Sequence, residues 1–212
     1  MSDMRGRRIL TTLQEDGRLV VELAEESLPP PTGHDVVVRV EAAPINPSDL
    51  GLLFGPADLD NAEYGDGRIV ATMPDGARRA MAARVGQAMP VGNEGAGTVV
   101  AAGEAADAQA LLGKTIACVA GGMFAQYRTV DARSVIELPD NATAEQGASA
   151  FVNPLTALGF VETMRRDGHS AIVHTAAASN LGQMLLRITK EDGVPLVNIV
   201  RSPTQAAMLK DM

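Results

Sequence analysis

The chain is short of cysteine, aromatic residues and positive charge. It has one cysteine in 212 residues, no tryptophan, 3% aromatic residues and a formal net charge of −8. A single cysteine excludes an intrachain disulfide and is typical of a reducing compartment. Nucleic-acid binding depends on clustered lysine and arginine, and no basic stripe is present, so we expect no nucleic-acid partner.

Long apolar runs are also missing. Arg5, Arg7 and Arg8 lie near the N-terminus, but no long apolar segment follows them and no window approaches a membrane span. We therefore expect a soluble, cytoplasmic protein that does not enter a membrane. Cys118 lies in the apolar run 115–120, which favours a small buried hydrophobic residue over a nucleophile.

The segment 170–201 has the outline of a dinucleotide-binding unit. An apolar strand over 171–173 leads into a turn of small residues over 175–182. Apolar residues at helical spacing from Leu181 predict a helix that stops at Asp192-Gly193, and a second apolar strand follows over 195–200. Short apolar strands of this kind are typical of parallel sheets, which bind ligands at the carboxyl ends of their strands.

The turn of this unit lacks the usual glycines. Ala176, Ser179 and Gly182 stand in their places, and small side chains there would let a pyrophosphate approach N–H groups at the helix N-terminus. The alternative is a turn that merely packs the helix on the strand, and spacing alone leaves both open. The residues of the turn that we predict to bind the cofactor are Ala176, Ala178, Ser179, Asn180, Leu181 and Gly182.

Arg201 closes the second strand, where a dinucleotide fold places the group that reads the ribose. An acid there would bind the 2′-hydroxyl of NAD, whereas an arginine suits the 2′-phosphate of NADP. A solvated charge at a strand end is the alternative. Ser202 is predicted to cap a further helix that begins at Pro203, and the free N–H groups of that helix would face the same phosphate.

Before residue 140 the pattern predicts short strands and turns. Asn46 and Pro47 mark a helix start, and 55–89 shows little periodicity, so we expect a surface excursion or lid with a short helix near 77–85. The predicted strands are 8–14, 18–24, 35–43, 95–102, 114–120 and 123–130, and helices are predicted over 143–151 and 155–165. We therefore predict a β-rich domain over 1–140 and an α/β domain over 141–212.

Four motifs occur in a fixed order: Asn46-Pro47-Ser48-Asp49, Gly92-Asn93-Glu94-Gly95-Ala96-Gly97, Val152-Asn153-Pro154-Leu155-Thr156-Ala157 and the 176–182 turn. Over nearly the whole chain they resemble the medium-chain dehydrogenase/reductase superfamily. The resemblance implies an α/β plus β fold, with an irregular GroES-like β domain followed by the first part of a Rossmann domain, a doubly wound parallel sheet.

Zinc alcohol dehydrogenases of that superfamily have a cysteine where Asn46 stands and a histidine where Asn93 stands. A catalytic zinc needs three protein ligands, and of the corresponding residues only Glu94 remains, so we expect no metal. The resemblance is therefore to the zinc-free branch, which includes quinone reductases and mitochondrial-type 2-enoyl thioester reductases. A zinc alcohol dehydrogenase is a less favoured alternative.

The zinc-free branch implies hydride transfer from NADPH to a quinone or to an activated C=C bond of a small-molecule substrate. Thr156 would help to hold the cofactor and Arg201 would select NADPH. A donor must stabilise the negative charge that develops on the substrate carbonyl. The tyrosine that enoyl reductases place after the first helix aligns with Ala57, so Tyr64, together with Asn46, is the catalytic candidate, and an exposed loop tyrosine is the alternative.

An open Rossmann sheet needs about six strands, and this chain supplies two. We expect the chain to be the front portion of a longer enzyme that pairs as a homodimer. The alternative is a catalytically inactive module with a role in assembly or binding.

Overall fold

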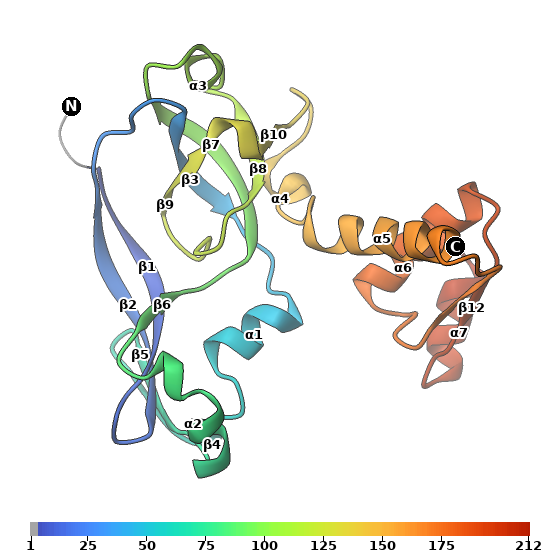
Figure 1. Ribbon diagram of the computed structural model, residues 1–212, viewed down its shortest axis with the longest axis horizontal. Coiled ribbons are helices and arrows are strands. Elements are labelled where there is room, and N and C mark those ends of the chain that lie inside the picture. Colours follow the sequence, from blue (N-terminus) through green and yellow to red (C-terminus); the bar gives the residue numbers. More distant parts are fainter. Residues whose placement is uncertain (1–3) are drawn as a thin grey trace. The chain divides into compact units, whose positions relative to one another are not determined.

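The computed structural model describes residues 4–212 and divides the chain into two compact units, Met1–Ser149 and Ala150–Met212 (Figure 1). The sequence places the boundary at residue 140. In the structure the short helix α4 (Ala144–Gly147), which Thr143 caps, packs on strands of the first unit, and Gly147 lies against Leu138. The division therefore falls nine residues later, after Ser149.

The first unit contains two antiparallel five-stranded sheets. One has the order β4-β5-β2-β1-β6 and is built on the long hairpin of β1 and β2. Its strands are β1 (Met4–Leu13), β2 (Arg18–Leu28), β4 (Asp58–Gly65), β5 (Arg68–Thr72) and β6 (Ala88–Pro90). Gly17, in the turn between β1 and β2, has a φ of 86°, which explains why glycine stands there.

The second sheet has the order β10-β8-β7-β3-β9. Its strands are β3 (Asp35–Ala42), β7 (Glu94–Ala102), β8 (Thr115–Val119), β9 (Tyr127–Asp131) and β10 (Val135–Glu137). A buried cluster that includes Val36, Val38, Val99 and Ile116 lies on it. The other helices of this unit are α1 (Pro47–Leu53), α2 (Asp75–Ala80), α3 (Ala106–Ala110) and the 3-10 turns η1 (Ala82–Arg84) and η2 (Ala132–Ser134).

The region 55–89 is not the irregular excursion that the sequence predicts. It forms the hairpin of β4 and β5, which extends the first sheet, and then α2, η1 and β6. The short helix predicted near 77–85 is present as α2 and η1. The turn residues Asp66 and Gly67 have φ values of 48° and 71°, as a tight two-residue hairpin turn requires. The Asp-Gly pair is a sequence signal for a turn. However, β4 is an edge strand with mostly exposed side chains, so its sequence shows no apolar alternation.

The second unit is a parallel βαβ arrangement preceded by a long helix. Strands β11 (Ile172–His174) and β12 (Leu196–Asn198) pair in parallel and are joined by α6 (Asn180–Glu191). The helix α5 (Val152–Arg166) packs on α6 around Ala157, Val161 and Leu185. The chain then enters α7 (Pro203–Lys210). The predicted fold class, a β-rich domain followed by the first part of a parallel α/β domain, is thus confirmed.

Helix α5 begins earlier than the sequence predicts. The predicted helix covers 155–165, whereas α5 starts at Val152 and has Pro154 as its third residue. A proline is tolerated in the first turn because its missing N–H would have no partner inside the helix. Within residues 4–212, no helix is long and apolar enough to cross a membrane.

Cys118 is buried in the core of the first unit, with its Sγ 3.7 Å from the Met123 sulfur. Burial raises the pKa of the Cys118 thiol to about 11, from an ordinary value of 9.0. The structure thus agrees with a small hydrophobic role for this residue, because the thiolate is the reactive form.

We expect Cys118 in the folded chain to react with a thiol reagent at pH 8 at least about 100-fold more slowly than in the urea-unfolded chain, because the thiolate fraction falls with the raised pKa. The raised pKa also contributes stability that is present below about pH 9 and lost as the pH rises through about 11. Time courses of labelling in buffer and in urea check this, and equal rates would contradict it.

Candidate functional site

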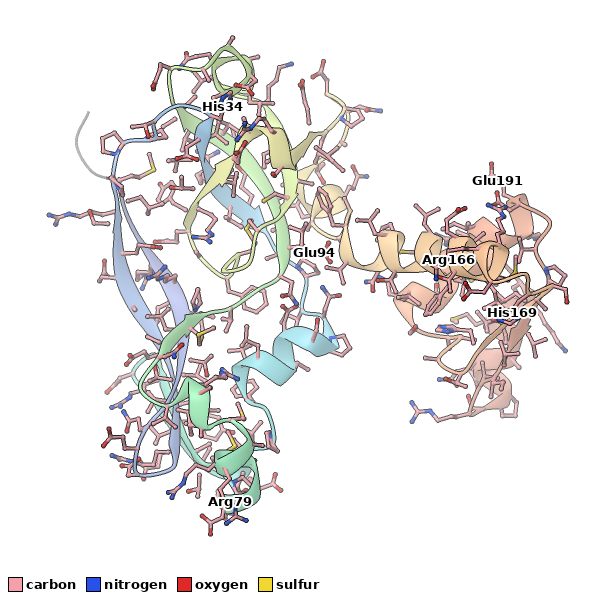
Figure 2. The ribbon with its side chains drawn as sticks, viewed as in Figure 1. His34, Arg79, Glu94, Arg166, His169 and Glu191 are labelled. Atoms are coloured by element: carbon pink, nitrogen blue, oxygen red, sulfur yellow. The ribbon has the colours of Figure 1, made fainter. Side chains whose placement is uncertain are left out.

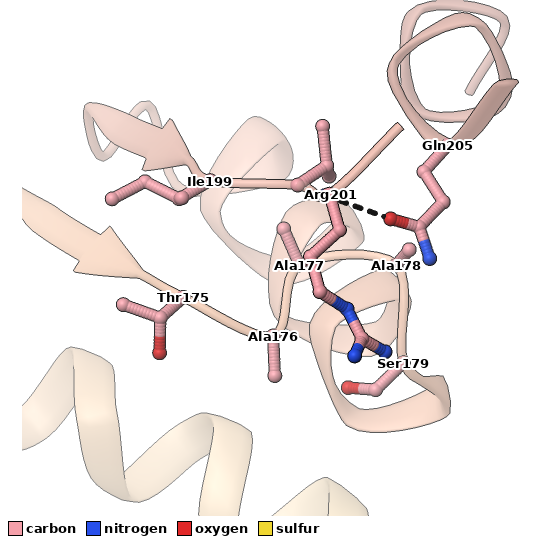
Figure 3. A pocket seen from close by; sticks show the side chains of 9 residues that line it. Thr175, Ala176, Ala177, Ala178, Ser179, Ile199, Arg201 and Gln205 are labelled. Atoms are coloured by element: carbon pink, nitrogen blue, oxygen red, sulfur yellow. Dashed lines mark hydrogen bonds between the residues drawn. The ribbon is translucent and has the colours of Figure 1, made fainter. Parts of the chain in front are cut away.

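The second unit brings a turn, two helix N-termini and an arginine around one pocket (Figure 3). Its volume is about 210 Å³. The pocket lies beyond the carboxyl ends of β11 and β12, which is where open parallel sheets bind ligands. The residues that line it are Thr175, Ala176, Ala177, Ala178, Ser179, Ile199, Val200, Arg201 and Gln205.

Ser179 organises the turn. It is the N-cap of α6, and its Oγ accepts a hydrogen bond from the Gly182 N–H at 3.1 Å, while its carbonyl accepts one from Gln183 at 2.9 Å. Gly182 is buried, and a Cβ at this position would lie 2.3 Å from the Ala177 carbonyl oxygen. The helix can therefore approach the preceding turn this closely only because residue 182 has no side chain.

Arg201 lies opposite the turn. Figure 3 shows its side chain extending across the pocket toward Ser179. The backbone N–H of Arg201 donates to Gln205 Oε1 at 2.9 Å, and Ser202 Oγ accepts from the backbone N–H of Gln205 at 3.2 Å. These bonds hold the start of α7 next to the Arg201 backbone. A cation and two helix N-termini then face the same space, which is an arrangement that favours phosphate.

The predicted cofactor residues are distributed around this pocket. Ala176, Ala178, Ser179 and Arg201 line it, and Ser202 caps α7. Asn180, Leu181 and Gly182 form the first turn of α6, directly after the lining residues. Thr156 lies on α5, is exposed and donates to the Val152 carbonyl; it is not among the lining residues. The lining residues that were not predicted to bind the cofactor are Thr175, Ala177, Ile199, Val200 and Gln205.

The first unit contains a buried polar cluster at the start of α1. Asn46, Asp49 and Glu94 are 5%, 0% and 0% exposed. Asp49 accepts from the Asn46 N–H at 2.8 Å and from the Asn93 N–H at 2.9 Å, and the Asn46 side chain donates from Nδ2 to Glu94 Oε1 at 3.0 Å. Glu94 opens β7 (Figure 2). The cluster thus ties the helix start to a strand 48 residues away.

Asp49 and Glu94 were not among the predicted site residues, although the sequence carries a signal for the first of them. An asparagine followed three residues later by an acid is a capping pattern, and the Asp49 carboxylate accepts the N–H of the N-cap residue Asn46. Within residues 4–212, no group of three or more His, Cys, Asp or Glu side chains is placed to hold a metal ion.

Tyr64 lies in the hairpin of β4 and β5, whereas Asn46 lies in the buried cluster before α1. The tyrosine is 64% exposed, and its hydroxyl donates to the Leu59 carbonyl at 2.9 Å. Its ring lines an apolar groove with Ile9, Val21, Leu23 and Ile69. The catalytic roles of Tyr64 and Asn46 stay predictions.

Comparison with known proteins places these features in a family. Residues 32–140 match the family model described as the alcohol dehydrogenase GroES-like domain. The mitochondrial enoyl-[acyl-carrier-protein] reductase of Mus musculus is 28% identical over 198 residues, which are 92% of this chain and 47% of the relative. Prostaglandin reductase-3 of Bos taurus is 28% identical over 210 residues, 96% of this chain and 48% of the relative.

The solved structures agree in fold. The structure of a proposed NADPH:quinone reductase from Mesorhizobium loti has a TM-score of 0.70 and 29% sequence identity, and the match covers 98% of this chain and 58% of that one. Mycobacterial Rv1454c, solved in complex with NADPH, has a TM-score of 0.67 at 21% identity, covering 97% and 55%. The chain spans about half the length of the curated relatives that it matches.

Proposed function

Because the chain belongs to the medium-chain dehydrogenase/reductase superfamily and carries its alcohol dehydrogenase GroES-like domain, we propose that it is part of a zinc-free, NADPH-dependent oxidoreductase. The reaction is hydride transfer from NADPH to a quinone or to an activated C=C bond. The observation that carries the proposal is the pocket where the small-residue turn faces Arg201.

The pocket suits the adenosine side of NADPH. Small side chains at Ala176 and Ala178 leave room beside the N-terminus of α6, so a pyrophosphate would accept from the backbone there. Arg201 and the capped start of α7 would bind the ribose 2′-phosphate, since a guanidinium matches a phosphate in charge and in bidentate geometry. When bound, the cofactor supplies the hydride.

The proposal excludes a catalytic zinc for reasons of ligand chemistry. Asn46 and Asn93 stand where zinc members of the superfamily have a cysteine and a histidine, and carboxamides are poor zinc ligands. The Asn46 carboxamide is engaged by Glu94, and the Asn93 side chain donates to Ser48 Oγ at 3.0 Å. Both positions thus serve the local hydrogen-bond network.

Between the two substrate classes, the arrangement favours a quinone. Reduction of an enoyl thioester needs a hydrogen-bond donor placed at the substrate carbonyl. Tyr64, the candidate donor, uses its hydroxyl on Leu59 within its own strand. A quinone depends less on one positioned donor. The names of the relatives include both classes, so the enoyl thioester stays the second candidate.

Titration with NADPH and NADH, followed by nucleotide fluorescence, tests the cofactor. We expect NADPH to bind more tightly, and R201Q to weaken NADPH by about 10- to 100-fold, the value of a charge-assisted hydrogen bond, while changing NADH by less than about threefold. R187Q is the matched control, because Arg187 is an exposed arginine on α6 outside the pocket. If neither nucleotide binds, or if R201Q changes both alike, the cofactor proposal fails.

The reaction is tested with the protein that contains this chain in its full length. Oxidation of NADPH is followed with a quinone and with a 2-enoyl thioester as separate acceptors, and the quinone is expected to give the faster rate. Faster reduction of the thioester, together with loss of that activity in Y64F, would replace the quinone by the enoyl substrate.

A further inference from the structure

His174 and Asn198 are neighbours at the carboxyl ends of the two parallel strands. His174 ends β11, Asn198 ends β12, and the two are register partners. Side chains alternate along a strand, so both lie on the same face as Ile172 and Leu196, which pack on the cluster formed by α5 and α6. Val173, on the opposite face, is 63% exposed. The two polar side chains are therefore directed into the layer between sheet and helices.

One polar atom on each of these side chains is buried without a hydrogen bond. Within residues 4–212, neither His174 Nε2 nor Asn198 Oδ1 has a partner. The His174 ring also lies against Phe160 of α5, with ring centroids 5.8 Å apart. Leaving a buried donor or acceptor unpaired is costly, and nearly all such groups in folded proteins are paired with protein or with ordered water.

The two atoms are chemically complementary. A neutral histidine donates from Nε2 in one of its tautomers, and a carboxamide oxygen accepts. They do not bond to each other directly, but adjacent strands lie about 4.8 Å apart, so one small molecule can reach both. A buried water molecule needs at least two polar partners, and this pair offers one donor and one acceptor.

We propose that His174 and Asn198 bind one buried water molecule that bridges the ends of β11 and β12. The water accepts from His174 Nε2 and donates to Asn198 Oδ1. The next residues along the chain, Thr175 and Ile199, line the nucleotide pocket, and the Ile199 N–H donates to the His174 carbonyl at 2.9 Å. The bridge therefore supports the two strand ends from which the pocket is built.

A double-mutant cycle in the 212-residue chain tests this without any nucleotide. H174F removes the donor to the water and N198L removes its acceptor, so in each variant the remaining polar atom shares a buried water that has lost a partner. Each substitution is therefore expected to lower the melting temperature by about 5 °C. The double variant H174F/N198L removes both polar atoms and is expected to melt above either single variant. Additive shifts would show that the two side chains share no partner and would overturn the proposal.

Two further measurements detect the bridging water even if one of these variants does not fold. H174Q retains a side-chain donor and is expected to lose less stability than H174F. A crystal structure of the unmodified chain is expected to show an ordered water within about 3 Å of both atoms. A direct bond between the two side chains, or a dry contact, would overturn the proposal.

Discussion

Replacing Gly182 with alanine is expected to abolish measurable NADPH binding and to destabilise the unit 150–212 by about 3 kcal/mol. A Cβ at this position would lie 2.3 Å from the Ala177 oxygen and 2.8 Å from the Ala176 oxygen. Both are backbone atoms, so no flexible side chain can move aside. The turn must open, and the N–H groups at the start of α6 then lose their alignment with the pocket.

Urea unfolding and the fluorescence titration with NADPH measure the two effects of G182A. The matched control is G159A on α5, where a Cβ would meet nothing within 4 Å. Alanine there is expected to stabilise the helix by about 0.5–1 kcal/mol. If G182A unfolds at the same urea concentration as the unsubstituted chain, the close approach does not constrain the turn. If it is destabilised but binds NADPH normally, only the assignment of the cofactor site to this turn fails.

Replacing Asp49 with alanine is expected to cost about 2–4 kcal/mol in the free energy of unfolding of the first unit. The Asp49 side chain is completely buried, and its two oxygens accept the backbone N–H groups of Asn46 and Asn93. Without the carboxylate both N–H groups lose this acceptor. The start of α1 also loses one of its connections to the strand β7, which Asn93 immediately precedes, while the bond from Asn46 to Glu94 remains.

Urea unfolding of D49A, D49N and D58A separates burial from hydrogen bonding. D49N keeps one acceptor oxygen and is expected to lose about half as much stability as D49A. Asp58 also bonds to a neighbour, Asn61, but on an exposed surface, so D58A is expected to unfold at the midpoint of the unsubstituted chain. A midpoint for D49A equal to that of D58A would contradict the structural role of the buried cluster.

The second unit, Ala150–Met212, is the part of the chain whose secondary structure the local sequence pattern predicts well. Apolar spacing, the Ser179 and Ser202 caps, the Asp192-Gly193 stop and the apolar strands predicted β11, α6, β12 and the start of α7 within a few residues of their observed bounds. Each of these signals is a property of residues close together in the chain, where spacing and capping act directly.

In the region 55–89 the local pattern did not predict the strands. The Asp66-Gly67 turn is a local signal for a hairpin, but β4 exposes most of its side chains at a sheet edge. An exposed edge strand is held by backbone hydrogen bonds to β5, which leave no trace in the pattern of apolar residues. The strand could therefore be recognised only once the sheet was assembled.

The sequence by itself determined the family resemblance, the order of the two domains and the βαβ outline, because motifs, caps and periodicity lie within short stretches of chain. Only the tertiary structure decided which polar residues meet: Asn46 with Glu94, Asp49 with Asn93, and His174 beside Asn198. These pairs are separated by tens of residues, and strand register and burial bring them together. The same packing placed Arg201 opposite the turn that contains Ser179, so both of these predicted cofactor residues line one pocket.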